Sequence, residues 1–137
     1  MEFAQICDRV GTDAAIYPPD LSGLLGTWIN SNLDTNSIAR VKIADVDGKL
    51  QLQVFAIGPD GLIDWGPTGA EVFAAGPGSH TGVGFACRYD FGFAEARLQA
   101  MIMKGLLVLA QFHLFRDDSG RADYFLREYF ARSHDRF

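Results

Sequence analysis

Apolar and polar residues alternate along most of the chain from Gly26 onward, in short runs that end at turn residues. A period of two places successive side chains on opposite faces, which is the pattern of a β-strand with one buried face. This pattern predicts strands at residues 26–32, 38–46, 49–57, 69–75, 81–91, 94–103, 106–116 and 121–132. The longest interval without it is Gly58–Gly69, which we expect to be an irregular connection.

The turns between these strands favour hairpins. Asp47-Gly48 is typical of a two-residue type I′ turn, Lys104-Gly105 occupies an equivalent place, and Asp117–Gly120 forms a slightly longer loop. A meander of eight hairpin-linked strands has two exposed edges unless it closes on itself. We therefore expect an all-β, up-and-down antiparallel barrel of about eight strands, preceded by a short N-terminal helix over residues 2–9.

The chain reads as one domain, with an N-terminal helix or extension at 1–20, the barrel at 21–132 and a tail at 133–137. The turns predict that Val41 pairs with Val54, Met103 with Leu106 and His113 with Tyr124, and this register decides which residues face the interior. Glu95, Arg97 and Gln99 are predicted to face water. The apolar residues predicted to face inward are Val41, Ile43, Leu52, Val54, Val83, Phe85, Cys87, Leu98, Ala100, Ile102, Leu107, Leu109, Leu126 and Phe130. The polar residues predicted to face inward are Asn30, Tyr89, Gln111, His113, Tyr124 and Glu128.

A tryptophan opens the first strand, in the motif Gly26-Thr27-Trp28, and Arg132 near the end of the last strand has inward parity. In these features the chain resembles the lipocalin-like (calycin) barrels of the compact intracellular kind, in layout over about residues 20–132. The resemblance implies that Trp28 is a structural plug at one end of the barrel. It also implies that Arg132 packs across the Trp28 ring in a cation–π contact.

Composition and charge argue against several classes of binding partner. The 137 residues carry a net charge of −5, which argues against nucleic acid and anionic membranes because both require a basic surface. The first ten residues lack the features of a signal peptide, and no apolar run reaches the roughly 18 residues of a membrane span. We expect a cytoplasmic protein with free thiols at Cys7 and Cys87, no cofactor, and no metal, since the histidines lack ligand spacing.

The polar residues predicted to face inward are the candidate functional residues, and each also has a purely structural interpretation. His113 is either a ligand-binding or general-base histidine, or a core histidine satisfied by Tyr124. Gln111 and Glu128 either orient the polar part of a ligand, or Glu128 leans into solvent at the rim. Trp65 either covers the mouth as a lid or staples its loop to the barrel.

Three functions follow from these residues. The first is binding of a small, mostly apolar organic molecule in the cavity, oriented by Gln111, His113, Tyr124 and Glu128. The second is a lipocalin-like cyclase or isomerase of small-molecule biosynthesis, in which His113 or Glu128 carries the proton. The third is a non-catalytic interaction protein that forms a homodimer. Its outward aromatic residues would be Phe55, Phe112 and Phe125.

Overall fold

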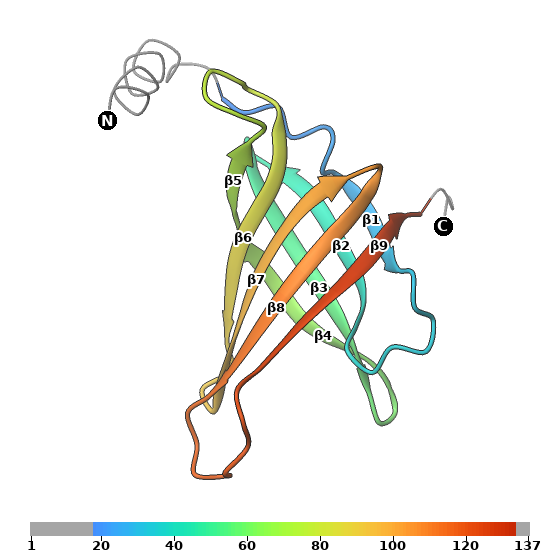
Figure 1. Ribbon diagram of the computed structural model, residues 1–137, viewed down its shortest axis with the longest axis vertical. Coiled ribbons are helices and arrows are strands. Elements are labelled where there is room, and N and C mark those ends of the chain that lie inside the picture. The colour runs from blue at the N-terminus through green and yellow to red at the C-terminus, as the bar shows by residue number, and fades with distance from the viewer. Residues whose placement is uncertain (1–17, 134–137) are drawn as a thin grey trace.

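The computed structural model describes residues 18–133, which form one antiparallel sheet of nine strands curled into a half-barrel (Figure 1). Figure 1 shows β6 to β9 in front and β2 to β4 behind. The strands are β1 (Gly26–Asn30), β2 (Ile38–Val46), β3 (Lys49–Gly58), β4 (Gly61–Gly69), β5 (Glu71–Ala74), β6 (Gly82–Asp90), β7 (Ala94–Met103), β8 (Leu106–Phe115) and β9 (Tyr124–Arg132).

The all-β class and the antiparallel meander are confirmed, whereas the predicted helix over 2–9 lies outside the described residues. In the described part of the chain, no helix has the length and apolarity needed to cross a membrane. The strand order is β4-β3-β2-β1-β9-β8-β7-β6-β5, so the first and last strands pair with each other. The edges β4 and β5 are consecutive in the chain, and Ala70 alone separates them.

The sheet differs from the predicted cylinder of about eight strands at this edge. Among residues 18–133, no ladder joins β4 to β5 or to β6, so the backbone hydrogen bonding does not run all the way around. Side chains bring the edges together instead, because the Tyr89 hydroxyl on β6 donates to the Gly66 carbonyl on β4 at 2.8 Å.

The prediction that Gly58–Gly69 is irregular is wrong, because most of this segment is strand β4, paired with β3. The alternation is missing because β4 buries neither face: its residues are exposed or half-buried throughout. The register also shifts opposite Trp65 and Gly66, and Gly66 has a φ of 86°, which breaks the period of two at that point. The β5 strand is shorter than the predicted 69–75.

The two-residue turns explain why the predicted register of the other hairpins is correct. Asp47 and Gly48 have φ values of 53° and 82°, and Lys104 and Gly105 have 53° and 79°. Positive φ at both central residues is the type I′ geometry, whose twist matches that of the flanking strands. As predicted, Val41 pairs with Val54, Met103 with Leu106, and His113 with Tyr124.

Trp28 closes one end of the half-barrel. Its side chain is 2% exposed, and its indole Nε1 donates to the Leu24 carbonyl at 3.0 Å. The Arg132 guanidinium lies 4.6 Å from the centre of the ring and donates to the Gly23 carbonyl. The contact predicted between Trp28 and Arg132 is therefore present. Leu24, Phe85 and other fully buried side chains fill the interior on this side.

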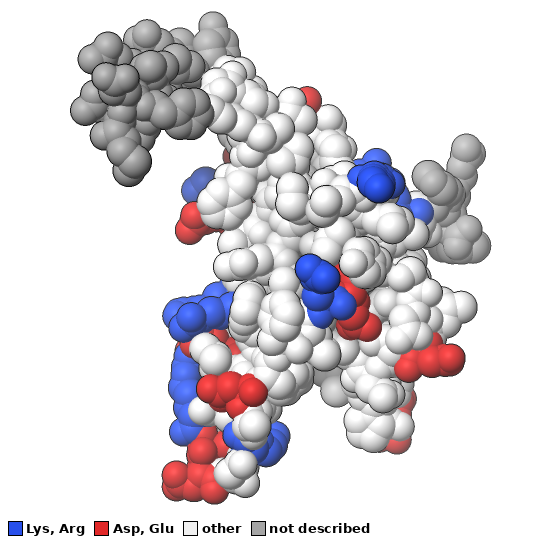
Figure 2. All heavy atoms as spheres, in the orientation of Figure 1, with Lys and Arg blue, Asp and Glu red and all other residues white. Residues whose placement is uncertain are grey.

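The prediction that Glu95 faces water is wrong. Its side chain points outward from β7 yet is 5% exposed, because three arginines cover it. Arg97 Nε lies 3.0 Å from its carboxylate, Arg116 Nη2 2.9 Å and Arg88 Nη1 3.4 Å. These cations satisfy a carboxylate that would otherwise be costly to bury. Figure 2 shows that charged side chains gather toward the end of the molecule where the β8–β9 loop lies.

We expect this cluster to make the free energy of unfolding depend on pH in the acidic range. The hydrogen bonds from Arg97 and then Arg116 hold the pKa of Glu95 below its usual value. A carboxyl whose pKa is lower in the folded than in the unfolded state stabilises the fold above the unfolded pKa of about 4.3. That contribution is lost as pH falls through the folded value. The Glu95→Gln variant, which does not titrate, should therefore lose less stability than the parent between about pH 5 and pH 3.

Urea denaturation at several pH values measures this difference. The pKa values of Asp90 and Asp117 are also lowered, chiefly by hydrogen bonds from Gly92 and Ser119 respectively, and both groups are retained in the variant. Both groups make the same contribution to the pH dependence of stability in the parent and the variant. The difference between the two proteins therefore measures the contribution of Glu95. Identical pH dependence of parent and variant would show that the arginine cluster does not act as described.

Candidate functional site

A polar cluster lies on the inner face, away from the Trp28 end. The chain leaves β1 at Asn30, passes through the loop 31–37 and returns in β2, so this loop lies against β8 and β9. Gln111 on β8 is completely buried. Its Oε1 accepts a hydrogen bond from Ser37 Oγ at 3.1 Å and lies 3.0 Å from Nε2 of His113. Its Nε2 is buried without a partner.

Glu128 on β9 is the second member of the cluster. Its Oε2 accepts a hydrogen bond from Thr35 Oγ1 at 2.8 Å, and its Oε1 is buried with no partner. Glu128 pairs in register with Leu109, and Gln111 pairs with Leu126, so Gln111 and Glu128 are diagonal neighbours on one face. One donor and one acceptor are thus buried on the same face, and neither has a hydrogen-bond partner in the part of the chain that the structure describes.

His113 and Tyr124 form the aromatic wall beside this pair. Their rings stack with centroids 4.4 Å apart and an angle of 8° between the planes. The polar partner of His113 is therefore Gln111, and Tyr124 contributes its ring face. Burial lowers the pKa of His113, so its imidazole is neutral at pH 7. Tyr124 is 45% exposed, which places it at the rim of the site.

Trp65 and Tyr89 have structural roles. The Trp65 ring meets the rings of Tyr89, Phe91 and His113 edge-on, at centroid distances of 5.3, 5.1 and 6.3 Å. Because Trp65 is on β4 and Tyr89 on β6, this contact and the Tyr89 hydroxyl bond to Gly66 connect edge strand β4 to β6, the neighbour of the other edge strand. Both interpretations of Trp65 assumed a loop, whereas Trp65 lies on strand β4 and packs against Tyr89 and Phe91.

Asn30 positions the loop. Its Nδ2 donates to the Ile38 carbonyl at 2.9 Å, and its Oδ1 accepts from the backbone of Asn32 at 2.8 Å. Both polar groups of the amide are used. Asn30 therefore acts on the site indirectly, by orienting the loop that carries Thr35 and Ser37.

A pocket of about 410 Å³ lies between this loop and the inner face of β9. Its lining residues are Asn32, Asp34, Thr35, Asn36, Ser37, Tyr124, Leu126 and Glu128. Sequence reasoning missed Thr35 and Ser37. Their one signal is the run of hydroxyl and amide residues at 30–37, which reads equally well as an ordinary polar loop. We call this pocket and the adjoining Gln111 and His113 the mouth site.

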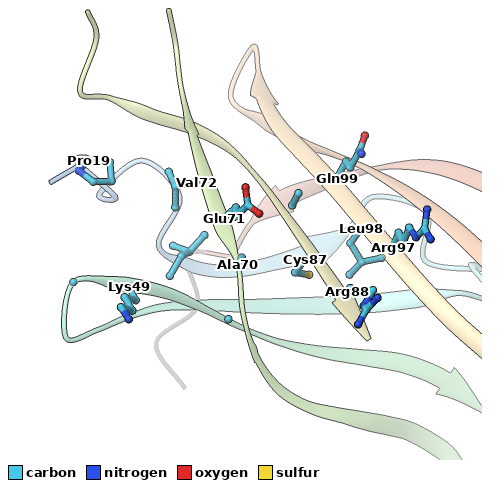
Figure 3. Close-up of a pocket in the computed structure, with 14 residues that line it drawn as sticks. Pro19, Lys49, Ala70, Glu71, Val72, Cys87, Arg88, Arg97, Leu98 and Gln99 are labelled. Atoms are coloured by element: carbon cyan, nitrogen blue, oxygen red, sulfur yellow. The ribbon is translucent and has the colours of Figure 1, made fainter. Parts of the chain in front are cut away.

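A second, larger hollow of about 760 Å³ follows the seam between the two edges of the sheet (Figure 3). Figure 3 shows Pro19 at one end of it, Arg88 and Arg97 at the other, and Cys87 between them. Burial raises the pKa of Cys87 to about 12, so this sulfur remains a protonated thiol near neutral pH and a poor nucleophile. The predicted Cys7 lies outside the described residues.

The structure brings together four of the predicted ligand or catalytic residues, namely Gln111, His113, Tyr124 and Glu128. Within residues 18–133, no group of three His, Cys, Asp or Glu side chains could hold a metal ion. Comparison with family models, with curated proteins and with solved structures gives no match for this chain. A proposal of function therefore rests on the chemistry of the residues themselves.

Proposed function

We propose that this protein is a lipocalin-like barrel that binds a small organic molecule at its mouth. The observation that carries the proposal is the buried, unpartnered pair formed by Gln111 Nε2 and Glu128 Oε1. An unsatisfied buried polar group costs about 1–3 kcal/mol, and a charged one costs more. A ligand that accepts from the amide and donates to the carboxylate would remove both costs. The contact between Trp28 and Arg132 supports the lipocalin-like assignment.

The site favours a ligand with an apolar body and one polar part. Leu126 and the rings of Tyr124 and His113 offer apolar contact beside the polar pair. The volume of about 410 Å³ falls at the lower end of the range typical of ligand pockets, roughly 300–1,000 Å³. Trp28 is buried at the other end, and Tyr124 at the rim is 45% exposed, so the ligand would enter from the mouth.

Titration with a neutral fluorescent probe, Nile red, tests this proposal. We expect micromolar binding by the parent and affinity at least about tenfold weaker in Gln111→Leu, because losing a buried hydrogen bond costs about 1–3 kcal/mol. Gln51→Leu, a matched change on the outward face of β3, should leave the affinity unchanged. Equal Nile red affinity in parent and Gln111→Leu would contradict binding at the mouth site.

A cofactor-independent cyclase or isomerase is the second candidate, and one observation favours it. His113 is neutral and Glu128 has a free carboxylate oxygen, so both groups are able to carry a proton within one site. A binder and an enzyme differ in what Glu128→Gln changes. In a binder it alters affinity alone, whereas in an enzyme it lowers turnover of bound substrate.

We also propose that the protein forms a homodimer through the outer side of β8 and β9. Phe112 and Phe125 contact each other at 4.9 Å between centroids on the outer side of β8 and β9. Phe125 is about half exposed, and so are Met101 and Met103 farther along the outer side of β7, where they pair with Val108 and Leu106 of β8. Phe55 is less available, because the cationic groups of its neighbours on β2 lie over its ring at about 5.5 Å. The β8–β9 face is therefore the stronger candidate for self-association.

A further inference from the structure

We infer that the mouth site, if it binds ligands as proposed above, takes an apolar amine and rejects carboxylates. The amine would carry a hydroxyl or carbonyl oxygen near the nitrogen. Its N–H would donate to Glu128 Oε1, and the oxygen would accept from Gln111 Nε2. This inference rests on the proposed function and adds the chemical class of the ligand.

The carboxylate of Glu128 sets the first requirement. Thr35 already satisfies Oε2, and the remaining buried oxygen has no donor among residues 18–133, so a ligand could supply one. A charged donor forms the stronger hydrogen bond with a carboxylate, and an ammonium group would also neutralise it in a poorly solvated place. A second carboxylate there would meet a like charge at short range. The site therefore discriminates by charge as well as by shape.

The charged groups around the site also favour an amine over a carboxylate. The acidic lining residues are Asp34 and Glu128, and no lysine or arginine is among the described residues that line this pocket. The nearby Arg121 is engaged elsewhere, because it pairs with Asp117 at 2.7 Å and lies 4.4 Å from the centre of the Phe115 ring. His113 adds no positive charge, since burial keeps its imidazole neutral at pH 7.

The arginines of β9 are also directed away from the mouth. Arg132 lies over Trp28 at the plugged end of the half-barrel. Arg127 lines a hollow on the outer side of the sheet, with Met101 and Val108. A carboxylate ligand at the mouth would therefore find no cation to pair with in the described residues that surround it.

Aromatic rings add a second attraction for a cation. Tyr124 and His113 stack at the rim, and Trp65 and Phe91 extend the aromatic cluster inward. Ring faces attract ammonium groups, by about 0.5–2 kcal/mol depending on solvent exposure. The donor of Gln111 then distinguishes among amines, because it lacks a partner unless the ligand brings an acceptor oxygen.

Three probes with the same ten-carbon chain test this inference: decylamine, 1-decanol and decanoate, each displacing Nile red at pH 7. We expect decylamine to bind at least about tenfold more tightly than decanoate, with decanol between them, as one charge-assisted hydrogen bond replaces one like-charge contact. An amino alcohol of the same chain length, 2-amino-1-decanol, should bind more tightly than decylamine in the parent. That gain should disappear in Gln111→Leu.

Glu128→Gln, which keeps the shape of the side chain, should reduce the preference for amine over carboxylate to about threefold or less. Asp118→Asn removes an equal charge from the exposed β8–β9 loop and should leave the preference intact. Circular dichroism checks that both variants fold. Equal binding of decanoate and decylamine by the parent, or an unchanged preference in Glu128→Gln, would overturn the inference while ligand binding stands. Failure of Nile red and all four alkyl probes to bind would overturn the proposed function itself.

Discussion

Replacing Trp28 with alanine is expected to lower the free energy of unfolding by about 3–5 kcal/mol, the largest loss for a single side chain in this protein. The side chain is among the largest that are fully buried, and it ends in a hydrogen bond to Leu24 and a stacked guanidinium from Arg132. Truncation opens a cavity at the end of the barrel and leaves the Leu24 carbonyl without its donor. Both effects destabilise the folded state, and neither is offset in the unfolded chain.

Urea denaturation followed by circular dichroism measures the effect. Trp65→Ala is the matched control, because Trp65 is the same residue type but only half-buried and lies on an edge strand. It should cost clearly less than Trp28→Ala. If Trp28→Ala does not fold, Trp28→Phe retains most of the volume and loses the Nε1 donor, so a smaller but measurable loss is expected. A loss below about 1 kcal/mol in Trp28→Ala would contradict the structural plug.

The hairpins of this fold are readable from the sequence because two-residue turns leave little freedom of register. Asp47-Gly48 and Lys104-Gly105 each fix a long ladder, and alternation along both partners then assigns the faces. The prediction that His113 lies opposite Tyr124 depends on a longer loop and is also correct. It assumed that the Asp117–Gly120 loop places Arg116 opposite Arg121, and the β8–β9 ladder has the register that this assumption implies.

What could not be predicted depends on contacts that leave no alternating pattern in the sequence. Strand β4 does not alternate because it buries no face, so only its backbone bonds to β3 reveal it. Glu95 has the parity of a solvent-facing residue, and its burial results from arginines on three different segments. The mouth site likewise depends on Thr35 and Ser37, whose loop conformation leaves no periodic signal. The residues of the ladder were predictable, and their partners in the loop were not.

Gly84→Ala should cost about 1–3 kcal/mol, the range typical of overpacking, although it adds a single methyl group to a strand. Gly84 lies on β6 opposite Met101 of β7, and a Cβ there would meet the Ala100 carbonyl oxygen at 2.6 Å and the Met101 Cβ at 3.4 Å. The first of these atoms belongs to the backbone of the neighbouring strand and cannot rotate away. The β6–β7 ladder must therefore separate locally, which weakens hydrogen bonds that hold the front of the sheet.

Gly69→Ala is the control that isolates this effect. Gly69 also lies in a strand, and a Cβ there has no heavy atom within 4 Å. Both changes reduce the backbone freedom of the unfolded chain equally, which by itself stabilises a protein by about 0.4–1 kcal/mol. The difference between the two variants in urea denaturation thus reports the steric contact alone. If Gly84→Ala is as stable as Gly69→Ala, the close approach of β6 to β7 is absent in solution, and the register that places Cys87 opposite Leu98 comes into question with it.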